Sequence, residues 1–121
     1  MPFPPDVLAE LAAATEVEIE TRRPDGPLHR TIVWVVVDGE DVFVRSWRGA
    51  SARWYREATA NPRVVVHHAD RRIEARVEPA TDPASVARAS AGYRRKYAGD
   101  PATPAMVRDE ALPATLRLTP L

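Results

Sequence analysis

Residues 26–62 read GPLHRTIVWVVVDGEDVFVRSWRGASARWYREATANP, and this stretch decides the fold. It contains two strongly patterned strand segments, 28–37 and 42–47, separated by Asp38-Gly39, a pair that is typical of a hairpin turn. A segment with helical spacing, 51–60, follows and stops at an Asn-Pro pair, because the residue before a proline disfavours the helical backbone. The stretch therefore predicts a β-hairpin followed by a short helix.

The flanking sequence also has patterns typical of short strands and helices. Alternation of apolar and polar residues predicts strands over 16–22, 63–69, 72–78 and 114–119. Helical spacing predicts an N-terminal helix within 1–14, an outer helix over 82–98 and a short helical piece over 103–110. Short antiparallel strands with helices packed outside predict a mainly β, α+β architecture: a small six-stranded antiparallel barrel forming a single domain over 1–121.

The second predicted strand, 28–37, changes character along its length. Its first half alternates, whereas Trp34, Val35, Val36 and Val37 are apolar on both faces. A strand that is apolar on both faces enters a core on both sides, as in a closed barrel or at a subunit interface. We therefore expect a homodimer that buries Trp34 or its neighbours.

The amino-acid composition of the chain excludes several classes of function. The formal net charge is zero, so no long-range field favours nucleic acid or an acidic membrane as a partner. The chain has no cysteine, which removes thiolate metal sites and thiol nucleophiles, and no other metal-binding motif is present. No apolar run approaches the roughly 20 residues that span a bilayer, and the N-terminus does not resemble a signal peptide. We expect a cytoplasmic protein without a metal.

A cluster of polar residues follows the third predicted strand. Its members are Arg45, Ser46, Arg48, Gly49, Ser51 and Arg53. Guanidinium groups and hydroxyls at a helix N-terminus, with a glycine that lets the backbone approach, are suited to a phosphate or carboxylate. The alternative is that these arginines pair with surface glutamates, and the sequence supports both interpretations equally.

The run GPLHRTIVWVVVDGEDVFVRSWRG, with NPRVVV after it, resembles the flavin-binding split barrels related to pyridoxamine 5'-phosphate oxidase. It is equally similar to the deazaflavin-dependent reductases of that superfamily, and within the superfamily it resembles most a small family labelled as a domain of unknown function. The similarity covers residues 16–79 well and the remainder in outline. The resemblance implies a six-stranded split barrel, a homodimer and a flavin across the dimer interface.

The resemblance also implies site residues. The strand that lines the isoalloxazine edge maps onto residues 30–35, with Arg30, Thr31 and Val33 as ring contacts. The residues implied to bind the phosphate are Arg45, Ser46, Arg48, Ser51 and Arg53. The basic pair that relatives carry at the helix start becomes Arg53-Trp54, so Trp54 stands where relatives keep a lysine, and the loop before it is longer than in the oxidases. The implied function is an FMN- or deazaflavin-dependent oxidoreductase, in which the cofactor carries the hydride chemistry. The alternative is a non-catalytic binding protein, or an orphan barrel that has lost its flavin.

Two finer expectations concern the orientation of neighbouring side chains. Adjacent residues of a strand point to opposite faces, so His67 and His68 do not act as a pair on one ion. By the same rule Trp47 should face away from the ligand if Ser46 faces the phosphate, which leaves Trp54 as the tryptophan nearer the ligand.

Overall fold

The computed structural model describes residues 1–121 and contains one seven-stranded sheet in which every pairing is antiparallel. Its strands, in the order in which they lie side by side, are β2 (Leu28–Val33), β1 (Val17–Arg22), β5 (Arg63–His68), β6 (Arg71–Pro79), β7 (Thr115–Pro120), β4 (Asp41–Arg45) and β3 (Val35–Asp38). The helices are α1 (Pro5–Ala13), α2 (Arg53–Ala60), α3 (Pro83–Lys96) and α4 (Thr103–Val107), with 3₁₀ helices η1 (Gly49–Ser51) and η2 (Asp109–Ala114). The mainly β architecture with peripheral helices is confirmed.

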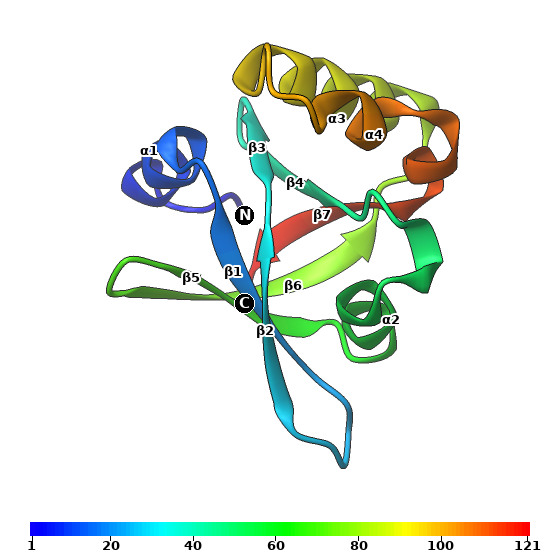
Figure 1. Ribbon diagram of the computed structural model, residues 1–121. Coiled ribbons are helices and arrows are strands. Elements are labelled where there is room, and N and C mark those ends of the chain that lie inside the picture. Colours follow the sequence, from blue (N-terminus) through cyan, green and yellow to red (C-terminus); the bar gives the residue numbers. More distant parts are fainter.

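The sheet curls into a half-barrel because its two edge strands are consecutive in the chain. β2 and β3 lie at opposite ends of the strand order and are joined by Trp34 alone. Figure 1 shows them as two parts of one long run, in cyan, with β2 pairing to β1 and β3 to β4. The prediction of six strands is therefore wrong: the expected strand 28–37 is divided at Trp34, whose carbonyl accepts a hydrogen bond from the Tyr93 hydroxyl at 3.1 Å.

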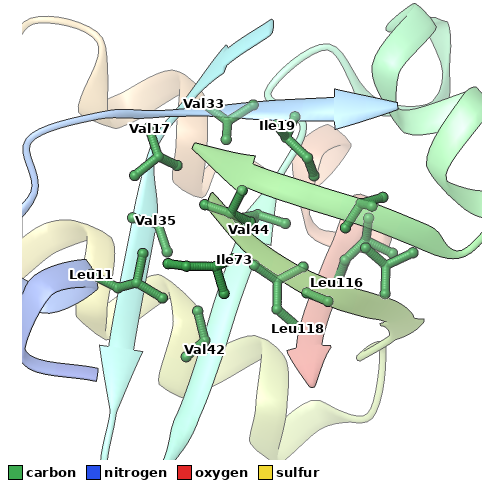
Figure 2. Packing of buried hydrophobic residues seen from close by; sticks show 14 of the residues in the cluster. Leu11, Val17, Ile19, Val33, Val35, Val42, Val44, Ile73, Leu116 and Leu118 are labelled. Atoms are coloured by element: carbon green, nitrogen blue, oxygen red, sulfur yellow. The ribbon is translucent and has the colours of Figure 1, made fainter. Parts of the chain in front are cut away.

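The inside of the curled sheet holds the main core. Figure 2 shows valine, isoleucine and leucine side chains from several strands converging there. The expected alternation is confirmed in β1, where Val17 and Ile19 are buried, and in β6, where Ile73, Ala75 and Val77 are buried between exposed neighbours. Each of these strands contributes one apolar face to the core and leaves the other face polar.

A second, smaller core lies between α3, α4 and the outer face of β3 and β4. It contains Val36, Phe43, Ala80, Ala89, Tyr93, Tyr97 and Met106. Gly92 lets α3 come close, because a Cβ at this position would lie 3.2 Å from side-chain carbons of Val36. The two apolar faces of β3 are thus covered within one chain: Val35 belongs to the main core and Val36 to the second. The apolar pattern at 34–37 is accounted for without a second copy.

Several element boundaries differ from the sequence expectation. β4 ends at Arg45 rather than at residue 47, and Ser51 belongs to η1, so α2 begins at Arg53. The expected helix over 103–110 is divided into α4 and the start of η2. The start of the outer helix is as expected, since a carboxylate oxygen of Asp82 accepts a hydrogen bond from the Ser85 amide at 3.0 Å. Hydrogen bonding by the side chain of Ser85, together with its amide, holds the pKa of Asp82 below its ordinary value.

Lys96, the only lysine of the chain, lies at the C-terminal end of α3. Its Nζ donates hydrogen bonds to the carbonyls of Val35 at 2.6 Å and Leu11 at 3.0 Å, and it forms no ion pair with a carboxylate. Burial without a countercharge lowers the pKa of Lys96 from 10.5 to about 8. Lys96 therefore fastens α1 to β3 through backbone carbonyls.

We expect the free energy of unfolding to rise between pH 8 and pH 10. In that window the unfolded chain keeps a proton on Lys96 that the folded chain has released, so raising the pH favours the folded state. Above pH 10 the trend reverses, because burial raises the pKa of Tyr97 from 10.0 to about 12. Urea denaturation across this range should show the rise in the wild type and not in Lys96→Met; parallel pH curves for the two proteins would contradict the assignment.

Candidate functional site

A cleft with a volume of about 660 Å³ opens beside β2 and α2, and this volume lies within the range of small-molecule and cofactor sites. Four segments line it: the end of β2, the turn after β4, the start of α2 and α4. The lining residues are Thr31, Ile32, Val33, Trp34, Arg45, Ser46, Trp47, Arg48, Ala52, Arg53, Trp54, Ala102, Ala105 and Met106. The stretch that decides the fold thus also builds most of the cleft.

Most of the residues expected at a ligand site lie together in this cleft. They are Thr31, Val33, Arg45, Ser46, Arg48, Arg53 and Trp54. Two others do not line it. The Arg30 guanidinium is paired with Glu18 at 2.6 Å on the surface, and the Ser51 hydroxyl donates to the Arg48 carbonyl at 2.7 Å.

Arg45 lines the cleft from the protein interior and is only 2% exposed. Its guanidinium donates to the hydroxyls of Thr115 at 2.8 Å and Ser90 at 2.9 Å, and to the carbonyls of Met106 at 3.0 Å and Val86 at 3.1 Å. Four of the five N–H groups of a guanidinium are thereby engaged, and burial lowers the pKa of Arg45. Arg45 joins β4, β7, α3 and α4, and so fixes the position of α4 at the cleft.

The turn after β4 brings Ser46 and Trp47 to the same cleft. The expectation that Trp47 faces away assumed that the strand continues through residue 47, and it is wrong because β4 ends at Arg45. Ser46 is buried and its hydroxyl donates to the Gly49 carbonyl at 2.8 Å. Trp47 is 51% exposed, with the guanidinium carbons of Arg48 and Arg108 at 6.0 and 5.9 Å from its ring centroid. Past a strand end, alternation no longer predicts side-chain direction.

The charged residues of the cleft are all arginines. No Asp or Glu lines it, and the exposed guanidinium groups of Arg48 and Arg53 form no ion pair. Arg53 opens α2, and the preceding Ala52 provides no side-chain cap for the first amide groups of the helix. Unpaired amides at a helix start attract an anion, and so do the two guanidinium groups. The mouth of the cleft is therefore suited to a phosphate or carboxylate.

Glu57 anchors α2 against the sheet and thereby holds Arg53 beside β2. Its carboxylate accepts a hydrogen bond from the Thr21 hydroxyl at 2.8 Å and lies 3.1 Å from His29 Nδ1. Burial acts to raise the pKa of Glu57, but the bonds with Thr21 and His29 outweigh it and keep that pKa below its ordinary value. A charged Glu57 thus ties α2 to both β1 and β2.

No histidine lines the cleft, and each one is paired with a glutamate. Besides His29 with Glu57, His67 Nε2 lies 2.8 Å from Glu20 and His68 Nδ1 lies 2.6 Å from Glu10. No three His, Cys, Asp or Glu side chains come together to hold a metal ion. The structure gives the histidines structural partners.

The residues that sequence reasoning missed are small or come from a distant segment. They are Ala52, Ala102, Ala105 and Met106. An alanine carries no chemical signal of a binding role, and α4 reaches the cleft only through the tertiary packing of Arg45 and the second core.

No helix of the protein is long and apolar enough to span a membrane.

The chain belongs to a family described as an uncharacterized protein conserved in bacteria, DUF2255, whose model matches residues 7–118. That match spans nearly the whole sheet and all four elements of the cleft. No curated protein matches the chain.

Solved structures with the same fold come from several bacteria. HutZ, a heme storage protein from Vibrio cholerae, has a TM-score of 0.71 and 15% identity, covering 100% of this chain and 92% of that one. A conserved hypothetical protein from Mycobacterium tuberculosis has a TM-score of 0.70 and 18% identity, covering 93% and 76%. A candidate pyridoxamine 5'-phosphate oxidase from Listeria innocua has a TM-score of 0.63 and 16% identity, covering 93% and 87%. The fold is that of the split barrels.

Proposed function

We propose that the cleft binds FMN or a deazaflavin and that the protein is an oxidoreductase of the split-barrel type. The observation that carries this proposal is the composition of the cleft: Trp34, Trp47 and Trp54 line one space with Arg48 and Arg53, and no carboxylate is present. Flat apolar walls suit a conjugated ring, and guanidinium groups suit a phosphate. The same split-barrel fold occurs in the candidate pyridoxamine 5'-phosphate oxidase.

The residues of the cleft fit the two ends of such a cofactor. Arg48 and Arg53 would hold the phosphate, with the first amides of α2 beside them. Thr31 and Val33 would contact the ring along β2, whose outer edge has no partner strand and so leaves backbone groups free to hydrogen-bond. When bound, the cofactor supplies hydride transfer, while the protein binds it, orients it and excludes water.

A second candidate function is heme binding without catalysis by the protein. HutZ and a heme-binding protein from Mycobacterium smegmatis share the fold. The observation in this chain that favours it is Met106, a buried thioether in the cleft wall that is a potential iron ligand, with the two guanidinium groups available for propionates. Flavin and heme thus compete as explanations of the same cleft.

A spectroscopic titration separates the two. We expect the purified protein to bind FMN or a deazaflavin with a change in the visible spectrum, and to bind riboflavin more weakly because riboflavin lacks the phosphate. Heme added in parallel should give no sharp iron-ligand band. Tight heme binding with no response to FMN or deazaflavin would replace the first function by the second, and no response to any of the three would exclude both.

We further propose that the protein is a homodimer whose contact includes the rim of the cleft. The exposed large apolar side chains beside it are Ile32 at 58% and Trp47 at 51%, with Leu28 at 47% on the same face of β2 as Ile32. Light scattering is expected to give twice the chain mass of 13.4 kDa. Ile32→Arg should shift the protein toward monomer, and Arg72→Ala on the exposed face of β6 should not. A monomeric wild type at micromolar concentration would contradict the proposal.

A further inference from the structure

Trp34 occupies an unusual place, the single residue at which the long strand is divided into β2 and β3. Its carbonyl is bound by the Tyr93 hydroxyl, and its indole lies parallel to the Tyr97 ring, with centroids 3.9 Å apart and planes 5° apart. Tyr93 in turn lies 6.1 Å from Tyr97 at 26°. Three aromatic rings thus form a series that begins in the buried second core and ends at Trp34.

The plane of Trp34 is fixed from behind. The Tyr97 hydroxyl donates to the Thr15 carbonyl at 2.7 Å, and Lys96 Nζ lies 5.4 Å from the Tyr97 ring centroid. Tyr97 is therefore held by a hydrogen bond and a cation–π contact, and it covers one face of the indole. Trp34 is partly exposed and is one of the residues that line the cleft.

The other two tryptophans of the cleft are placed differently. Trp47 is half exposed and is flanked by the guanidinium groups of Arg48 and Arg108. Trp54 is 7% exposed, belongs to the main core and meets Tyr55 edge-on at 84°. Of the three, Trp34 alone combines a ring stacked on its indole, partial exposure and a place in the cleft lining.

We propose that Trp34 is the platform on which the conjugated ring of the ligand stacks, as the next layer on the Tyr93–Tyr97–Trp34 series. The inference rests on the proposed function and deepens it. It assigns the ring to the side of the cleft formed by β2 and α4, away from the arginines of the turn and of α2. The ligand class that fits is a flat aromatic ring system joined to an anionic group by a flexible spacer.

FMN is the probe for the test, and Trp34→Leu is the main variant. Loss of one stacking partner weakens binding by about 5- to 150-fold, so we expect the FMN dissociation constant to rise by about tenfold or more. Trp34→Phe keeps an aromatic face and should stay within about threefold of the wild type. Trp47→Leu is the matched control in the same cleft and should have the smaller effect. The ability of inorganic phosphate to compete with FMN should be unchanged in all three variants.

A fluorescence experiment gives a second test, which does not require that the Trp34→Leu protein folds. In a protein with Trp47→Phe and Trp54→Phe, Trp34 is the only indole, and FMN should quench its fluorescence strongly. Two results would overturn the platform and leave the proposed function standing. Either Trp34→Leu binds FMN as tightly as the wild type does, or FMN binds to the protein with Trp34 as its only indole and does not quench its fluorescence. Failure of the wild type to bind FMN, deazaflavin or heme would overturn both.

Discussion

Replacing Arg45 by methionine is expected to lower the free energy of unfolding by about 2–4 kcal/mol. The substitution keeps much of the apolar stem but removes four hydrogen bonds from a side chain that is 2% exposed. The carbonyls of Val86 and Met106 would then be left without their donor in or near the second core. An unpaired buried acceptor costs about 1–3 kcal/mol, which is why the sum is large.

An opposing contribution limits the size of this effect. Burial lowers the pKa of Arg45, which means that its charge is held at a cost, and no carboxylate compensates it. Removing a buried charge together with all its partners can stabilise a protein, but here the four acceptors remain. The guanidinium also lies 5.5 Å from the Tyr93 ring centroid, a contact that methionine replaces only in part.

Urea denaturation measures this difference, with Arg48→Met as the matched control. Arg48 lies three residues further along, is exposed and has no ion pair, so its replacement should change stability by less than about 0.5 kcal/mol. Equal stability of the Arg45→Met and Arg48→Met proteins would mean that the hydrogen bonds of Arg45 contribute nothing net to folding.

The strands could be predicted from the sequence where one side of the sheet is covered and the other is open. β1 and β6 are such strands: Val17 and Ile19 mark the buried face of β1, and Ile73, Ala75 and Val77 mark that of β6. The division at Trp34 could not be predicted, because the apolar run from Ile32 to Val37 is continuous. The break depends on Tyr93 and Tyr97, about sixty residues away, and local pattern carries no information on such contacts.

The candidate site could be predicted in part for a related reason. The arginines and hydroxyls of 45–53 are close in sequence and remain close in space, so their clustering at the cleft followed from the residues themselves. What separates Arg45 from Arg48 is burial: Phe43 and Arg45 share the face of β4 that α3 and α4 cover, whereas Arg48 lies beyond the strand end. Two arginines of the same cluster thus serve different purposes, one inside the fold and one at the cleft mouth.

The largest effect on ligand binding is expected from replacing Arg48 and Arg53 together by alanine. A hydrogen bond to a charged group contributes about 1.5–3 kcal/mol, so the loss of both guanidinium groups should weaken FMN binding by about 3 kcal/mol or more, which is over a hundredfold. Each single variant should lose about tenfold. Riboflavin, which has the ring without the phosphate, should bind the double variant nearly as well as the wild type.

Arg56→Ala is the control that separates direct contact from the general field of positive charge. Arg56 lies on α2 like Arg53, but its guanidinium donates to the Ser51 carbonyl at 2.7 Å and it does not line the cleft. Its removal changes the net charge as each single variant does, so screened long-range attraction predicts a similar loss for Arg56 and Arg53, whereas contact predicts a loss for Arg53 only. Isothermal titration at two salt concentrations distinguishes these outcomes. Equal losses that vanish at high salt would remove Arg48 and Arg53 from the binding site and leave them as exposed surface charges.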